Sequence, residues 1–261
     1  MPSPTPHAAS ERLREMMRGR FTFQISVDTA GLAQGLVVAG AALKAGVTLV
    51  EMGTPLLKNE GVRHVVPAFR QRFPEALLLA DMKTMDGGGF EARAVFEGGG
   101  NIIDFLALAG VDSARAVCAV RDEFRRADAA VPRLAFADIL VPQQGPAAAA
   151  VEVAEQMVAA GVDGIGVHLQ LDARRAEPEL VRSGYLGEVA RAVFERVGAV
   201  VSVQVVGGLS VAEAQGLARA GLRAFVISGN LGVADAAARY GEAEGEIERL
   251  VGRFIKEVEG V

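Results

Sequence analysis

Short apolar segments alternate with longer, helix-like segments eight times along the chain. The short segments have the length and composition of strands that are buried on both faces, and the longer ones have the length of helices. We predict strands at residues 21–27, 47–52, 76–80, 102–108, 134–140, 164–168, 200–206 and 224–227. Such alternation is typical of a parallel sheet with helices packed outside it.

Glycines punctuate this pattern where a predicted helix ends. Gly46 and Gly161 stand after the last helical turn, where glycine adopts the left-handed conformation that leads the chain into the next strand. Eight strand–helix pairs in about 240 residues have the size of a closed (β/α)8 TIM barrel. We expect one domain: the barrel at 20–240, a tail and capping helix at 1–19, and a C-terminal helix extension at 241–261. The alternative, an open doubly wound sheet, is less favoured because polar residues follow many strands rather than one crossover point.

Composition narrows the classes of function. The net charge of −5 argues against binding nucleic acid through attraction to phosphate. The only cysteine, Cys118, lies in a helical pattern, so a disulfide framework is excluded and a reducing compartment is expected. Apolar runs are too short for a transmembrane helix, and the N-terminal residues lack the apolar centre of a signal peptide. We therefore expect a cytoplasmic protein without nucleic-acid or membrane partners.

Ionisable residues gather at the C-terminal ends of the predicted strands. Five of them stand at or near such ends: Asp28, Glu51, Asp81, Asp138 and His168. In a TIM barrel these ends meet at one rim, where the catalytic groups lie. Glu51 and Asp81 come from consecutive strands and could share a divalent cation, and oxygen ligands in this number suit Mg2+. The near-neutral pKa of an imidazole fits His168 for a general acid or base.

Lys83 adds a cation to this rim. Residues two apart on a strand project from the same face, so we expect the Lys83 ammonium to meet the Asp81 carboxylate. The pair is either catalytic or a structural ion pair. Similarly, Glu51 either helps to bind a cation or simply pairs with Lys83. The residues alone leave both alternatives open.

Glycine-rich loops follow the last two predicted strands. Gly207 and Gly208 follow the seventh strand, and Ser228 and Gly229 follow the eighth. Backbone amides placed before helix N-termini hold a phosphate at these two positions of many TIM barrels. Plain tight turns are the alternative. A phosphate site at one side of the rim and a cation site at the other together indicate a phosphosugar.

The segment 81–86, Asp-Met-Lys-Thr-Met-Asp, carries the Asp-x-Lys-x-x-Asp signature of the orotidine 5'-monophosphate decarboxylase suprafamily. Together with residues 51–56, Glu-Met-Gly-Thr-Pro-Leu, it makes the stretch 21–236 resemble the 3-hexulose-6-phosphate synthase / 3-keto-L-gulonate 6-phosphate decarboxylase family. The resemblance implies a Mg2+-dependent barrel lyase that forms a 1,2-enediolate of a ketose phosphate.

The same resemblance implies roles for individual residues. Glu51 and Asp81 would hold Mg2+, Lys83 would stabilise the enediolate, and His168 would move a proton. Developing charge on two adjacent oxygens would thus face a metal and a cation.

Three further aspartates also receive roles from the resemblance. Asp28 and Asp138 would contact sugar hydroxyls or hold Lys83 in place. Asp86 would reach across a dimer interface into the site of the second subunit, so the active unit would be a homodimer.

The expected activity is that of a 3-hexulose-6-phosphate synthase, an aldol condensation of formaldehyde with ribulose 5-phosphate. A keto-gulonate phosphate decarboxylase or another sugar-phosphate lyase is the alternative, but the decarboxylase carries an arginine where this chain has Leu171. A further alternative is a non-catalytic phosphosugar-binding barrel. Such a module would not need a metal pair and a proton-transfer group together.

Overall fold

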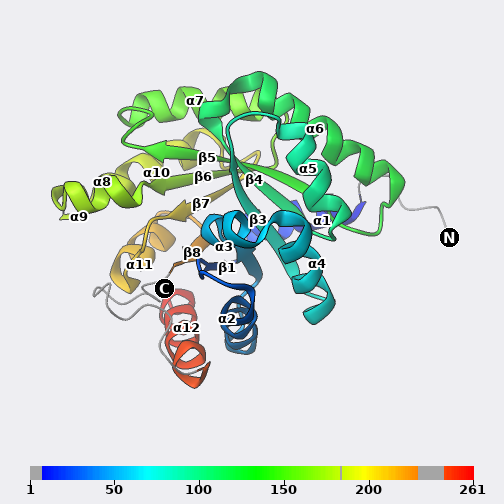
Figure 1. Ribbon diagram of the computed structural model, residues 1–261. Helices are drawn as coiled ribbons and strands as arrows, with labels where there is room; N and C mark the ends of the chain where they lie inside the picture. Colours follow the sequence, from blue (N-terminus) through cyan, green and yellow to red (C-terminus); the bar gives the residue numbers. More distant parts are fainter. Residues whose placement is uncertain (1–7, 183, 229–243) are drawn as a thin grey trace.

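The computed structural model of the protein describes residues 8–182, 184–228 and 244–261. Within them, eight parallel strands pair in sequence order and the last pairs with the first, which closes a barrel (Figure 1). The predicted (β/α)8 TIM barrel is therefore confirmed, and the open sheet is excluded. The strands are β1 (Thr22–Val27), β2 (Leu49–Met52), β3 (Leu77–Thr84), β4 (Ile102–Leu106), β5 (Leu134–Val141), β6 (Gly164–Leu169), β7 (Ser202–Val206) and β8 (Ala224–Ile227).

Helices surround the barrel on its outside (Figure 1). They are α2 (Leu32–Ala45), α3 (Thr54–Glu60), α4 (Val62–Arg72), α5 (Gly88–Glu97), α6 (Gly110–Ala127), α7 (Ala147–Ala159), α8 (Leu171–Ala176), α9 (Glu179–Arg182), α10 (Tyr185–Val197), α11 (Val211–Arg219) and α12 (Glu244–Glu259), with one 3-10 turn at Ala107–Ala109. Among the described helices, none has both the length and the apolar character needed to cross a membrane.

Most strands begin or end within two residues of their predicted bounds, and β3 differs more. Between β2 and β3 the chain forms two helices, because Gly61, with a φ of +84°, ends α3 before α4 begins. The third strand was expected to end at residue 80, yet β3 continues to Thr84 with a shift of register against β4. Lys83, inside this irregular stretch, has a φ of +45°. The extra length carries Asp81 and Lys83 on the strand itself rather than on a loop.

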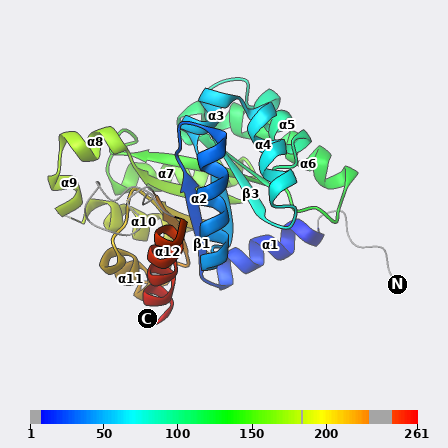
Figure 2. The same ribbon diagram turned by 60° about the horizontal axis from the view of Figure 1, so that its bottom comes forward.

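The C-terminal helix α12 packs beside α2 on the outside of the barrel (Figures 1 and 2). Phe254 of α12 is buried, and its ring lies edge-on against the Phe23 ring of β1 at a centroid distance of 6.3 Å. The boundary expected at residue 240 lies outside the described residues.

The barrel interior has an apolar lower layer and a polar upper layer. Inward-facing apolar side chains from four strands form one buried cluster: Leu49, Leu79, Ile102, Leu134 and Phe136. One strand pleat further on, the inward-facing side chains become polar. They include Ser26, Glu51, Asp81, Asp104 and Asp138, all buried. The outward-facing side chains of the strands pack against the helices and form the main core. These buried polar side chains lie toward the C-terminal ends of the strands.

Helix α1 (Ala8–Gly19) lies across the opposite end of the barrel (Figure 2). Its Leu13 and Met17 are buried against the lower apolar layer. Polar contacts join α1 to residues that precede β5, β6 and β7: Ser10 Oγ accepts from the Arg133 amide at 3.0 Å, Arg14 Nε lies 3.4 Å from Asp163 Oδ1, and Arg18 Nη1 donates to the Ala199 carbonyl at 2.8 Å. Residues 1–7 lie outside the described part.

We expect Leu13→Ala to lower the free energy of unfolding by about 2–4 kcal/mol, because the substitution removes buried methyl groups and leaves a cavity under the barrel. Glu15→Ala, at an exposed position of the same helix, is the matched control and should cost less than about 0.5 kcal/mol. Urea unfolding of both variants measures the difference. Equal stabilities would contradict the assignment of α1 as the closure of this end.

Candidate active site

Three buried carboxylates meet at the C-terminal end of the barrel. Asp81 of β3, Asp104 of β4 and Asp138 of β5 each offer an oxygen within 4.8 Å of the others. Asp81 and Asp104 are direct partners in the strand register, so they project into the barrel at one level. Gly166 on β6 leaves room for Asp138, because a side chain there would collide with the Asp138 carboxylate.

The Lys83 ammonium lies between two of these carboxylates. Its Nζ is 2.9 and 2.8 Å from the two oxygens of Asp81 and 3.3 Å from Asp138 Oδ2. The predicted contact between Asp81 and Lys83 is confirmed. Burial alone would lower the pKa of Lys83, but the charges of Asp81, Asp138 and Asp104 outweigh it and raise that pKa well above its usual value. Lys83 therefore remains an ammonium across the physiological pH range.

Local structure fixes this pair in place. Thr54 Oγ1, at the start of α3, donates a hydrogen bond to Asp81 Oδ2 at 2.8 Å. Thr84 is buried directly after Lys83 and donates from Oγ1 to the Glu91 carboxylate on α5. A positive φ is unusual for lysine, so contacts on both sides of Lys83 are needed to hold its backbone there.

Glu51 contacts other partners than Lys83. Its carboxylate accepts hydrogen bonds from Gln24 Nε2 and from Ser26 Oγ, the latter at 2.7 Å. The alternative of a direct Glu51–Lys83 pair is thus not what the structure contains. Burial, and then the nearby charge of Asp81, raises the pKa of Glu51 well above its usual value.

His168 is held by the same aspartate as Lys83. Its Nδ1 is 3.1 Å from Asp138 Oδ2. Burial would raise the pKa of Asp138, but Lys83 and the hydrogen bond to His168 outweigh it and hold that pKa at about 2. An ionised carboxylate can only accept, so Nδ1 carries the proton and donates it. In the neutral imidazole the lone pair then belongs to Nε2, which can take up a proton.

The cluster contains three carboxyl groups but only one ammonium, that of Lys83. Burial, followed by repulsion from Asp138 and Asp81, raises the pKa of Asp104 well above its usual value. Asp104 Oδ1 and Asp138 Oδ1 are buried without a hydrogen-bond partner among the described residues. A set of carboxylate oxygens with unused lone pairs fits a hard divalent cation such as Mg2+. Glu51 lies outside the close group of three, so the predicted Glu51–Asp81 cation pair stays a prediction.

Two predicted aspartates lie outside the close group of three carboxylates. Asp28 follows β1 at an exposed position, and Ser26 Oγ donates to its Oδ2 at 3.0 Å. Asp86 is exposed in the turn between β3 and α5, where its Oδ1 accepts from the Gly87 amide at 2.7 Å. The role of Asp86 in a second subunit stays a prediction.

Of the two predicted glycine loops, the structure describes the one after β7. Gly207 and Gly208 have φ values of +138° and +69°, which favour glycine over other residues. Ser228 directly follows β8, and Gly229 lies outside the described residues. Phosphate binding by these residues stays a prediction.

Residues 22–240 match the model of the Orotidine 5'-phosphate decarboxylase / HUMPS family. The chain belongs to this family. Among curated relatives, the 3-hexulose-6-phosphate synthase of Mycobacterium gastri is 30% identical over 227 residues, which cover 86% of this chain and 98% of that protein. The family resemblance inferred from the motifs is thereby confirmed.

Two solved structures share the fold of this chain. A crystal structure of 3-hexulose-6-phosphate synthase, 25% identical, covers 87% of this chain and 98% of its own with a TM-score of 0.69. The 3-keto-L-gulonate-6-phosphate decarboxylase of Vibrio cholerae O1 biovar El Tor, 22% identical, covers 92% and 98% with a TM-score of 0.71. The second likeness bears on the fold alone.

Sequence reasoning missed Asp104, although a signal was present. Asp104 is the one charged residue in the apolar run 102–106. It is the register partner of Asp81, and both side chains project into the barrel. Gln24 and Ser26 alternate in the same way within β1 and were also missed, although both bind Glu51. A polar residue in a buried strand indicates the polar interior layer as clearly as one at its end.

Asp104→Asn should stabilise the protein in the presence of a chelator. Because the folded pKa of Asp104 is raised, the folded state binds more protons than the unfolded state, and the free energy of unfolding falls as pH rises through the interval between the two pKa values. We expect a gain of about 1 kcal/mol or more at pH 8 that disappears near pH 4. Thermal unfolding across this pH range measures it.

The matched control is Glu152→Gln, at an exposed position of α7, which should show no such pH dependence. A pH-independent effect of Asp104→Asn would contradict the inference that Asp104 is electrostatically penalised in the folded protein.

Proposed function

We propose that the protein is a 3-hexulose-6-phosphate synthase, which joins formaldehyde to ribulose 5-phosphate through a 1,2-enediolate in a Mg2+-dependent reaction. The observation that carries the proposal is the contact of Asp138 with both Lys83 and His168 beside further buried carboxylates. A curated relative with this activity in its name matches along 98% of its own length.

His168 acts as the base in the first step. Lys83 is unsuited to this role because its raised pKa keeps it an ammonium. Asp138 instead orients His168 through Nδ1, which leaves Nε2 to take the proton from C1 of ribulose 5-phosphate. The Lys83 ammonium, held close to Asp81, stabilises the negative charge that develops on the enediolate oxygens.

The second step forms the carbon–carbon bond. The electron pair of the enediolate at C1 attacks the carbon of formaldehyde, and the carbonyl pair of formaldehyde moves onto its oxygen. The imidazolium of His168 then returns its proton to that oxygen, which restores the neutral base. Atoms and charges balance, and the chain needs no further acid for the cycle.

Asp81 and Glu51 would hold Mg2+, with Asp104 as a further carboxylate close to Asp81. When bound, Mg2+ would supply positive charge for the two adjacent oxygens of the ketose phosphate. The orphaned carboxylate oxygens and the raised pKa values of Glu51 and Asp104 support a cation in this place.

Other predicted residues complete the site. The loops with Gly207, Gly208, Ser228 and Gly229 bind the phosphate of the substrate, and Asp28 contacts a sugar hydroxyl. In a homodimer, Asp86 enters the site of the second subunit. Exposed apolar side chains flank Asp86: Met85 is 54% and Phe90 86% exposed, which supports a protein contact there. We place this metabolic enzyme in the cytoplasm.

Decarboxylation of a keto-gulonate phosphate is the alternative reaction. The fold likeness to a decarboxylase accommodates it. However, Leu171 begins α8 close after His168 and is an uncharged side chain that cannot replace an arginine. The absence of an arginine side chain at this position therefore favours the synthase reaction over decarboxylation.

Consumption of formaldehyde by the purified protein with ribulose 5-phosphate and Mg2+ tests the proposal. We expect consumption that stops when a chelator is added and resumes with excess Mg2+. Absence of consumption, together with decarboxylation of 3-keto-L-gulonate 6-phosphate, would favour the alternative enzyme. Tight binding of ribulose 5-phosphate without any turnover would favour a binding barrel.

Asp81→Asn and Glu51→Gln should each keep the fold but abolish turnover, because each removes a negative ligand of the proposed cation. Steady-state formaldehyde consumption and the circular dichroism spectrum measure the two effects. Turnover at the wild-type rate in either variant would remove that residue from the proposed cation site.

His168→Asn should lower kcat by about 100-fold or more, while the Kd for ribulose 5-phosphate changes by less than about threefold, because the base is lost but the phosphate and cation contacts remain. His64→Asn, an exposed histidine of α4, is the matched control and should behave as wild type. Calorimetric binding and turnover assays give both quantities. An unchanged kcat would exclude His168 as the base.

A further inference from the structure

The structure points to Arg174 as a positioning residue for the loop between β7 and α11. We propose that its guanidinium holds this loop in the one conformation that presents backbone amides to the substrate phosphate. The inference rests on the proposed function, which assigns Gly207 and Gly208 to phosphate binding.

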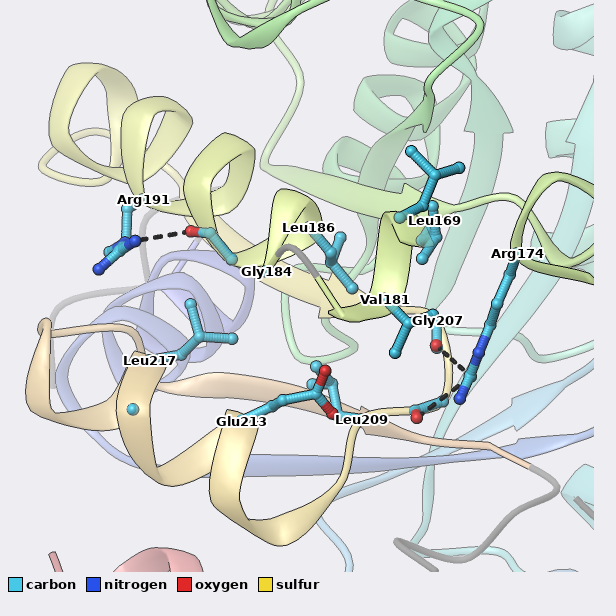
Figure 3. Close-up of a pocket in the computed structure, with 14 residues that line it drawn as sticks. Leu169, Arg174, Val181, Gly184, Leu186, Arg191, Gly207, Leu209, Glu213 and Leu217 are labelled. Atoms are coloured by element: carbon cyan, nitrogen blue, oxygen red, sulfur yellow. Dashed lines mark hydrogen bonds between the residues drawn. The ribbon is translucent and has the colours of Figure 1, made fainter. Parts of the chain in front are cut away.

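Arg174 reaches the loop from α8, across 33 residues of sequence. Its Nη1 donates to the Gly207 carbonyl at 2.6 Å and to the Gly208 carbonyl at 3.2 Å (Figure 3). Both contacts lie at a cavity of about 210 Å³ that residues of α8, α9, α10 and α11 line. The side chain thus bridges two separate segments of the barrel rim.

These contacts decide which way the loop peptides face. In a trans peptide the N–H points away from the side to which its carbonyl points. The carbonyls of Gly207 and Gly208 point to Arg174, so the N–H groups of Gly208 and Leu209 point to the opposite side. A phosphate bound by these amides would lie across the loop from the guanidinium, and Arg174 would act without touching it.

Two consecutive glycines need such a restraint. Gly207 and Gly208 both have positive φ values, and glycine also occupies several other backbone conformations at little cost. The flanks of the loop are already fixed. Gly207 packs against Leu169, and the reciprocal hydrogen bonds of Ser210 and Glu213 cap the start of α11. Arg174 fixes the segment between these two anchors.

Helix α8 also connects the Arg174 contact to the ends of β5 and β6. The helix begins two residues after the end of β6, the strand that carries His168. The backbone N–H of its N-cap residue, Gln170, donates to the Val141 carbonyl of β5 at 3.0 Å. Arg174 therefore ties the loop after β7 to the strand ends that hold Asp138 and His168. The distance between the phosphate and the proton-transfer group is set partly by this link.

Arg174→Met tests the inference because it keeps most of the side-chain volume and removes the donors. We expect the Kd for inorganic phosphate and for ribulose 5-phosphate to rise by about 10-fold, with a matching rise in KM and little change in kcat. In the ligand-free protein, hydrogen–deuterium exchange of the peptide covering 207–209 should become faster. Arg174→Lys keeps the charge on a shorter side chain and should recover the affinity only in part.

Arg191→Met is the matched control, because Arg191 lines the same cavity but donates to the Gly187 carbonyl of its own helix. Its phosphate affinity and loop exchange should equal those of wild type. Unchanged affinity in Arg174→Met would overturn the inference, as would lost affinity without faster exchange, which would make Arg174 a direct phosphate ligand. If the wild-type protein binds neither probe, the phosphate site of the proposed function fails, and the inference fails with it.

Discussion

The ammonium of Lys83 lies between Asp81 and Asp138, and the arrangement of the whole site depends on this contact. Strands β2 to β5 direct carboxylates into a space that water scarcely reaches, which would be unfavourable without positive charge. Lys83 satisfies part of this requirement, and its backbone takes an unusual positive φ to do so. Burial, followed by repulsion from the neighbouring carboxylates, raises the pKa values of Glu51 and Asp104. A divalent cation suits the same space.

The apolar layer and the carboxylate cluster occupy opposite ends of the barrel interior. At the N-terminal end of the strands, an apolar layer covered by α1 stabilises the fold through the burial of apolar side chains. At the other end, glycines and small residues leave room for charged groups, as Gly166 does for Asp138. Such a division lets the fold tolerate a destabilising cluster, because the apolar layer and the outer helices supply the compensating free energy.

Much of this arrangement was predictable from the sequence. The alternation of strands and helices gave the barrel, and the period of a strand placed Lys83 beside Asp81. Asp104 was missed because it lies within an otherwise apolar strand, and ionisable residues were expected only at the ends of strands. The hydrogen-bond partners of Glu51 depend on the register between β1 and β2, which cannot be predicted from a single sequence. The contact of Arg174 with Gly207 depends on how α8 packs, and no local pattern predicts that.

In the proposed mechanism, Asp138 orients the base, Lys83 opposes the developing charge, and the glycine loops hold the phosphate. The most direct measurement is exchange of the C1 proton of ribulose 5-phosphate with deuterium in D2O, followed by NMR without any aldehyde present. The proposed mechanism predicts exchange that requires the protein and Mg2+ and stops with a chelator. A C1 proton that stays unexchanged while ribulose 5-phosphate is bound and Mg2+ is present would contradict the proposed enediolate chemistry.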